Sequence, residues 1–274
     1  MIEIILVKLI IIFVLGLIFG SFANVVIERG QAKEGISGRS KCDSCKQKIN
    51  WYDNIPLVSY FIFLKGRCRQ CKDKIAWQYP IVEALFGGVF VLIAWRTGFI
   101  LGFLDQSEII NTSFYLSIGF ILLIILIWDL KYMIIPDGLV VGGLALSVCY
   151  FGYQYFISPD FLMSINTDLT RNFLGGILIS WFFYMMFAFS KGRWIGGGDV
   201  KLGFLVGFLV GWKMVYSVLL ITYIIGAIPA IYLLIRGKAT MKTRIPFGPF
   251  LIIASFISIF WKEDIILLWD KLIK

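Results

Sequence analysis

The sequence predicts an all-α polytopic membrane protein with about eight transmembrane helices and a small cytosolic module that contains four cysteines. Hydrophobic residues make up 59% of the 274 positions and the mean hydropathy is +0.86, well above the values of soluble domains. Several apolar runs reach the roughly 20 residues that a helix needs to cross a bilayer. The expected parts are a first transmembrane helix at 1–27, the four-cysteine module at 28–79 and a seven-helix membrane core at 80–274.

The apolar runs set the expected order of the helices. The first run, 4–27, lacks the basic start and the small-residue cleavage site of a signal peptide, so we interpret it as a retained helix. The further helices are expected at 80–95, 112–128, 138–158, 172–190, 199–212, 214–235 and 246–261. Residues 200–235 could instead form one long tilted helix, which would move the C-terminus to the other side of the membrane.

The distribution of Lys and Arg predicts the orientation. Most of the chain's 26 basic residues fall in the segments 28–79, 131, 191–193, 201 and 236–244, whereas the opposite connections 105–108, 160–168 and 263–264 are acidic. Because cytosolic loops carry the excess of basic residues, we predict a cytosolic module and both termini outside. A single helix over 200–235 would place the basic segment 236–244 outside, so two helices are favoured.

The chain contains no histidine. Ser-His-Asp triads, Cys-His pairs, zinc proteases with an H-E-x-x-H motif and 2-His-1-carboxylate iron sites all require that residue. Any hydrolytic chemistry must therefore rely on carboxylates, a lysine, or a metal held by cysteine and carboxylate ligands.

Two C-x2-C pairs in the hydrophilic segment predict a metal site. Cys42 and Cys45 form the first pair, and Cys68 and Cys71 form the second. Four thiolates at this spacing can close a tetrahedral zinc site, and a module of about 50 residues needs such a crosslink to fold. A disulfide pair or unligated thiols are the alternatives, which a reducing cytosol disfavours. Cys149, in an apolar run, is interpreted as a small buried hydrophobe.

The basic four-cysteine module does not predict nucleic-acid binding. Its positive charge is that of any cytosolic loop of a membrane protein. Its aromatic residues Trp51, Tyr52, Tyr60 and Phe61 are better explained by packing or by contact with the membrane interface.

Two aspartates at the ends of apolar runs are the candidate catalytic groups. Asp129 follows the run 114–128, and Asp199 follows the three glycines 196–198. A carboxylate in a spanning segment is energetically unfavourable and is a functional candidate by default. In a pair, an ionised carboxylate can deprotonate water while a protonated one polarises a carbonyl group. The glycines leave room for an extended peptide.

Each acidic residue also has a structural interpretation. Asp199 could merely cap the helix that follows it. Asp137 rivals Asp129 but directly precedes the fourth helix and is expected to be its N-cap. Glu83 is a possible supporting residue or a first-turn acid, and Asp53 is typical of a turn.

The order of the motifs resembles the type IV prepilin peptidases, membrane aspartyl proteases of the G-x-G-D class. The matching elements are GSFANVVI at 20–27, DNIP at 53–56 and GRCR at 66–69 within the cysteine module, YPIVE at 79–83, Asp129 with IPD at 135–137, GGGDVKL at 196–202 and PFGPFL at 246–251. They span nearly the whole chain.

This resemblance implies a function and its residues. Asp129 and Asp199 would be the catalytic pair, supported by Gly196, Gly198 and Lys201, in a bacterial inner membrane with the site facing the cytosol. The substrates would be prepilins or pseudopilins, cleaved after a glycine at the end of a basic leader. Many relatives also methylate the new N-terminus with S-adenosylmethionine. The residues that bind this methyl donor stay unknown, because no G-x-G-x-x-G loop follows a strand.

Two non-proteolytic hypotheses remain. In a transporter or channel, Asp129 and Asp199 would bind cations or relay protons, and the zinc module would be regulatory. No convincing repeat between the halves supports this hypothesis. A noncatalytic scaffold of a secretion or uptake machine is the third possibility.

Overall fold

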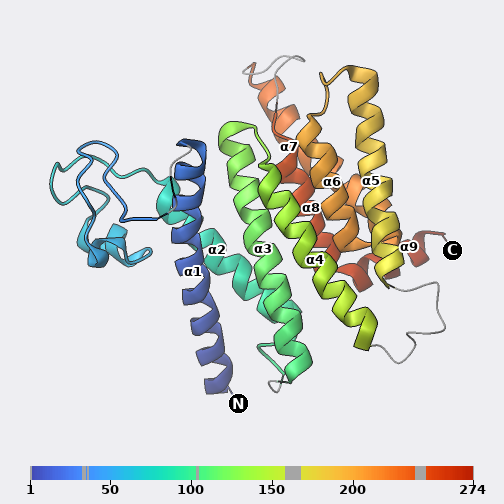
Figure 1. The fold of residues 1–274 in the computed structure, drawn as a ribbon, viewed down its shortest axis with the longest axis horizontal. Helices are drawn as coiled ribbons and strands as arrows, with labels where there is room; N and C mark the ends of the chain where they lie inside the picture. The colour runs from blue at the N-terminus through green and yellow to red at the C-terminus, as the bar shows by residue number, and fades with distance from the viewer. Residues whose placement is uncertain are drawn as a thin grey trace. The chain divides into compact units, whose positions relative to one another are not determined.

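The computed structural model describes residues 2–32, 35, 37–102, 105–157, 168–237 and 245–273 (Figure 1). In these residues the chain forms α-helices joined by turns, and it has no strand beyond two isolated β-bridges. The predicted all-α fold class is confirmed. Lys33 and the segments 158–167 and 238–244, which include basic and acidic positions used to predict the orientation, lie outside the described residues.

Nine α-helices occur in the described part of the chain. They are α1 (Ile2–Ala32), α2 (Gln78–Arg96), α3 (Gln106–Tyr132), α4 (Asp137–Ile157), α5 (Asp168–Ser190), α6 (Gly197–Val210), α7 (Val215–Ile235), α8 (Gly248–Phe260) and α9 (Lys262–Ile273). The first eight correspond to the predicted helices. Six of the described helices, α1 to α5 and α7, are long and apolar enough to cross a membrane. The other two predicted helices, α6 and α8, are shorter, with 14 and 13 residues.

The ninth helix, α9, was not predicted. In its sequence, KEDIILLWDKLI, charged residues flank the short apolar stretch IILLW, so it does not form an apolar run long enough to cross a membrane. Such a helix is typical of the membrane interface rather than of a spanning segment. Its Trp269 indole donates a 2.9 Å hydrogen bond to the Ser217 hydroxyl of α7.

The chain divides into two compact units, residues 1–120 and 121–274. In the first unit, α1 and α2 pack closely through small residues, since a Cβ on Gly16 would lie 2.7 Å from the Gly87 Cα. At 31 residues, α1 is about 46 Å long, which exceeds the roughly 30 Å hydrocarbon core. In its last turn, Arg29 donates hydrogen bonds to the carbonyl oxygens of Ser37 and Arg39 at the start of the four-cysteine module.

The second unit is built around α6. This helix is buried along most of its length and packs against α4, α5 and α8. Its contact with α5 is closest at Gly207, where an added Cβ would lie 2.2 Å from the Gly175 carbonyl oxygen. Large side chains such as Phe183 and Phe208 are fully buried around this contact.

A turn at Gly211 separates α6 from α7. Gly211 has a φ of +76°, which favours glycine, and a 3₁₀ turn at Trp212–Met214 follows it. The alternative of one long helix over 200–235 is therefore wrong. The predicted burial of Cys149 is also wrong, because this residue is exposed on α4.

Candidate functional site

Asp129 lies in the last turns of α3 and is buried, with 5% of its surface exposed. Its Oδ2 accepts a 3.1 Å hydrogen bond from the amide of Gly248, the first residue of α8. The N-terminus of a helix stabilises a negative charge through its dipole and its unpaired amides. A Cβ on Gly248 would lie 2.7 Å from the same oxygen, so only glycine allows this contact.

Asp199 is the third residue of α6 and is also buried, with 9% exposed. Its Oδ2 accepts a 3.0 Å hydrogen bond from the amide of Gly196, which precedes the helix. The side chain thus reaches back over the glycine turn, as the N3 acid of a capping box does. The helix-capping interpretation of Asp199 is correct in geometry, and it fixes the carboxylate at the start of α6.

Ile135 links the surroundings of the two aspartates. Its side chain lies 3.1 Å from the position of a Cβ on Gly198 and 3.4 Å from that of a Cβ on Gly248. The starts of α6 and α8 therefore meet on this residue, and the two helices pack against each other. Asp129 and Asp199 lie close enough for their charges to interact. Segments more than 100 residues apart thus form one acidic centre at two helix N-termini.

Asp137 does not belong to this buried pair. It is the first residue of α4, near the predicted N-cap position, and its side chain is 66% exposed. Both of its carboxylate oxygens lie 2.8 Å from Lys201 Nζ. The rival aspartate is thus neutralised by a lysine that stands two residues after Asp199 in α6.

The arrangement of Asp129 and Asp199 suits acid–base chemistry. Two carboxylates buried close together cannot both ionise without strong repulsion, so the pair favours sharing one proton. One group can then act as a base and the other as an acid. Beside them, a Cβ on Gly197 would meet no atom within 4 Å, which leaves open space along the glycine turn.

The four-cysteine module brings all four predicted ligands together. The Sγ atoms of Cys42, Cys45, Cys68 and Cys71 lie within 4.8 Å of one another. Cys42 Sγ and Cys71 Sγ are 3.8 Å apart, far longer than a disulfide bond of about 2.05 Å. Four Zn–S bonds of about 2.3 Å in a tetrahedron give sulfur–sulfur distances of about 3.8 Å. The cluster can therefore hold a metal ion.

The two cysteine knuckles have the same backbone structure. In the first, Cys42 N donates to Gln47 O and Lys46 N donates to Cys42 O, both at 2.9 Å. Cys68, Asp73 and Lys72 repeat this pattern in the second. The amides of Cys71 and Gln70 lower the pKa of the Cys68 thiol to about 7, which favours the thiolate that a metal requires. The Asp73 amide lowers the pKa of Cys71, but burial and the neighbouring thiols together raise it to about 12.

Two further contacts of the module were not foreseen from the sequence. Asp53, interpreted as a turn residue, is buried and binds the Arg69 guanidinium through two nitrogens, at 2.7 and 3.0 Å. Glu83 accepts a 2.8 Å hydrogen bond from the Leu57 amide and so fixes the module to α2. The sequence carries no signal for either pair, because the partners are 16 and 26 residues apart and belong to different segments of the chain.

Two family models match separate parts of the chain. The Bacterial Peptidase A24 N-terminal domain matches residues 14–97, which include the cysteine module. The Type IV leader peptidase family matches residues 116–231, which include both aspartates.

Curated relatives match nearly the full length. A protein of Pseudomonas putida is 31% identical over 92% of this chain and 90% of its own length. A protein of Legionella pneumophila is 33% identical over 83% of this chain and 74% of its own length. A protein of Vibrio cholerae serotype O1 is 30% identical over 93% of this chain and 97% of its own length. Each is named prepilin leader peptidase/N-methyltransferase. No solved structure matches the chain.

Proposed function

The chain belongs to the type IV leader peptidase family, and on this premise we propose that Asp129 and Asp199 are the catalytic pair with which it cleaves leader peptides from prepilins or pseudopilins. The observation that supports this assignment is the burial of the two carboxylates at the starts of α8 and α6. Gly196, Gly198 and Lys201 support the site by shaping the turn and by neutralising Asp137.

The proposed reaction needs only the two carboxylates and water. The ionised carboxylate removes a proton from a water molecule, whose oxygen then bonds to the scissile carbonyl carbon. The protonated carboxylic acid donates a hydrogen bond to the carbonyl oxygen and stabilises its developing charge. When the C–N bond breaks, the leaving amine takes a proton from the pair.

The proposed location is the cytoplasmic membrane of a bacterium, with the site at the cytosolic face. The protein is a multi-pass membrane protein, and basic residues flank the ends of the helices that carry the aspartates. Lys131, Lys191 and Arg193 lie on this side of the second unit, as the positive-inside rule requires. The basic leader of a prepilin would remain on the same side.

The proposed second activity is N-methylation of the new N-terminus with S-adenosylmethionine as donor. The support is that the full-length relatives are named N-methyltransferases as well as peptidases. For the cysteine cluster we propose a structural zinc ion, because four thiolates leave no open coordination position for catalysis. We expect no nucleic-acid partner for this module.

The test is a cleavage assay on the purified full-length protein in detergent. We expect both Asp129→Asn and Asp199→Asn to lower the turnover of a prepilin substrate by at least about a thousandfold, since each removes one member of the acid–base pair. Both variants should remain folded, as judged by unchanged thermal unfolding. Cleavage by either variant at a rate near that of the wild type would disprove the assignment. The transporter hypothesis predicts no cleavage by the wild type.

A further inference from the structure

The cysteine module carries an apolar patch, which consists of Phe61, Ile62, Phe63 and Trp77. The first three belong to the short π-helix Ser59–Phe63, and Trp77 directly precedes α2. All four side chains are more than half exposed, and the rings of Phe61 and Trp77 lie 6.1 Å apart. Contiguous apolar patches of this kind mark sites where a protein meets a partner or a membrane.

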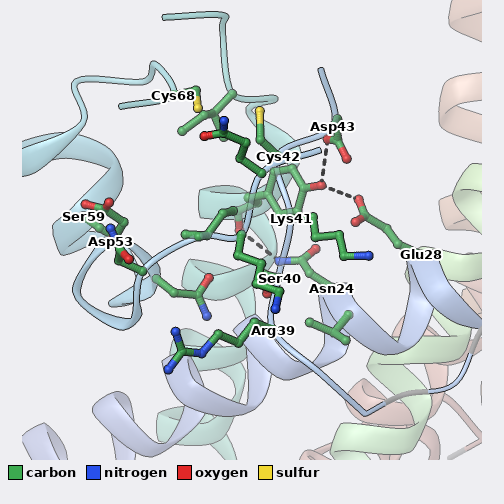
Figure 2. Close-up of a pocket in the computed structure, with 18 of the residues that line it drawn as sticks. Asn24, Glu28, Arg39, Ser40, Lys41, Cys42, Asp43, Asp53, Ser59 and Cys68 are labelled. Carbon is green, nitrogen blue, oxygen red and sulfur yellow. Dashed lines mark hydrogen bonds between the residues drawn. The ribbon is translucent and has the colours of Figure 1, made fainter. Parts of the chain in front are cut away.

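The other face of the π-helix lies on a polar cavity. This cavity has a volume of about 1070 Å³, and Figure 2 shows Asn24 of α1 and Ser59 of the π-helix among the residues that line it. Tyr60 also lines the cavity, whereas no residue of the apolar patch is among its described lining residues. The Tyr60 hydroxyl donates a 3.4 Å hydrogen bond to the Ile75 carbonyl oxygen. Of the aromatic residues for which packing and membrane contact were both open, Tyr60 therefore packs inside the module.

The apolar patch continues onto the surface of α2. Ile81, one turn after Trp77, is also more than half exposed. Leu85 and Leu92 extend the exposed apolar row, and their spacing of four and seven residues keeps it on one face of the helix. Because α2 is long and apolar enough to cross a membrane, this row suits contact with lipid tails. The patch thus stands where a spanning helix leaves the module.

A basic rim, formed by Lys65, Arg67 and Lys74, borders the apolar patch. Lys65 follows the π-helix by two residues, and Arg67 pairs with Lys74 in an isolated β-bridge. All three residues are exposed. The nearest acidic residue along the chain, Asp73, is engaged by the Ser44 hydroxyl of the first knuckle. Apolar side chains with a basic border are typical of surfaces that bind anionic membranes.

We propose that the apolar patch and its basic rim dock the cysteine module on an anionic phospholipid surface, at the leaflet from which α2 starts. The apolar side chains enter the headgroup region, and the basic side chains bind lipid phosphates. Because Trp77 is joined directly to α2, the patch is already held close to the membrane. Docking needs neither catalytic aspartate, so this inference goes beyond the proposed peptidase function and does not depend on it.

The test uses the full-length protein in lipid nanodiscs of phosphatidylcholine alone or of an equal mixture with phosphatidylglycerol. A phospholipid with a photoactivatable group on its acyl chain reports the contacts, and mass spectrometry identifies the crosslinked peptides. The yield for residues 58–63 is normalised to the yield for α2. We expect this ratio to be at least about threefold higher in the mixed discs, because anionic lipid strengthens the binding of basic residues.

Two double variants with the same loss of charge test the basic rim. Lys65→Gln combined with Arg67→Gln should lower the crosslinking of residues 58–63 in the mixed discs at least about threefold. The matched control is Lys46→Gln combined with Lys48→Gln, whose residues line the cavity instead of bordering the patch. This control should crosslink like the wild type.

The reactivity of Lys65 with a water-soluble amine reagent tests the apolar patch. In the wild type, docking should make Lys65 react more slowly than Lys48 of the same molecule. Phe61→Ser combined with Ile62→Ser should raise the ratio of the two rates at least about threefold, since serine removes the apolar surface that enters the membrane. An unchanged ratio would argue against docking through this patch.

Three outcomes overturn the proposal. The first is a lack of lipid crosslinks in residues 58–63, or equal yields in both kinds of disc, while α2 is crosslinked normally. The second is shielding of Lys65 only after a prepilin is added, which would assign the patch to the substrate. The third is crosslinking of residues 58–63 to residues 121–274 by a bifunctional reagent, which would show that the second unit covers the patch. Asp129→Asn should match the wild type in every lipid measurement.

Discussion

Lys201 Nζ lies 2.8 Å from both carboxylate oxygens of Asp137 and so ties the second turn of α6 to the first residue of α4. This ion pair sets Asp137 apart from the two other acidic residues near the site. Asp129 and Asp199 are buried and bound by backbone amides, whereas Asp137 is exposed and neutralised by a lysine. Burial and partner type therefore select the pair that can share a proton.

Replacing Asp137 should have a small effect on catalysis. Exposed ion pairs contribute about 0–1 kcal/mol, so Asp137→Asn should lower prepilin turnover by less than about tenfold. Asp129→Asn, assayed in parallel, should abolish turnover. A loss of turnover in Asp137→Asn as severe as that in Asp129→Asn would show that Asp137 takes part in the chemistry.

Adding a methyl group at Gly248 should disable the site. The new Cβ would lie 2.7 Å from Asp129 Oδ2, so Gly248→Ala must displace the carboxylate or the start of α8. Such a shift of about 1 Å can lower kcat by a hundredfold. The matched control is Gly142→Ala in α4, where a Cβ meets nothing within 4 Å and kcat should change by less than about threefold.

The kcat of Gly198→Ala should lie between those of these two variants, because its new Cβ would lie 3.1 Å from Ile135 Cβ. Single-turnover cleavage rates give the order directly. Equal rates for Gly248→Ala and Gly142→Ala would contradict the contact between Gly248 and Asp129.

The metal content should depend on pH. The amides of Cys71 and Gln70 lower the pKa of Cys68 to about 7, so its thiolate form predominates above that pH and is lost as the pH falls through it. Protons then compete with the metal for the thiolate. We expect about one zinc ion per chain at pH 8, and faster loss to a chelator at pH 5.5 than at pH 8.

Zinc release can be followed with a colorimetric indicator. Cys42→Ser should lower the zinc content and expose residues 37–77 to proteolysis, because the metal joins the two knuckles. Protein purified under reducing conditions with no zinc at any pH would argue for unligated thiols.

The contact between α5 and α6 should be essential for stability. A Cβ at position 207 would lie 2.2 Å from the Gly175 carbonyl oxygen, and backbone atoms cannot move aside as a flexible side chain can. Overpacking a core typically destabilises by about 1–3 kcal/mol, so Gly207→Ala should lower the Tm in detergent by several degrees. Gly142→Ala in α4 meets no atom within 4 Å and should leave the Tm nearly unchanged. Similar Tm values for the two variants would mean that the helices separate easily.

The sequence by itself determined the fold class, the order of eight helices and the two candidate chemical centres. Helices that cross a bilayer must satisfy their backbone hydrogen bonds internally and expose apolar side chains, so they leave a local signal in the sequence. The paired cysteines and the glycines before Asp199 are local signals of the same kind. The apolar stretch of the amphipathic α9 is too short to predict a spanning helix, so this helix was missed.

The tertiary structure alone decided which distant groups meet. It joined Asp129 to Gly248, Asp137 to Lys201 and Asp53 to Arg69. It also left the Asn24 acceptor buried in a cavity. Such contacts depend on how helices and loops pack in three dimensions, and the free energy of each is shared by residues that can stand more than 100 positions apart. No pattern along the chain encodes them, so the sequence indicates candidate groups, and packing selects their partners.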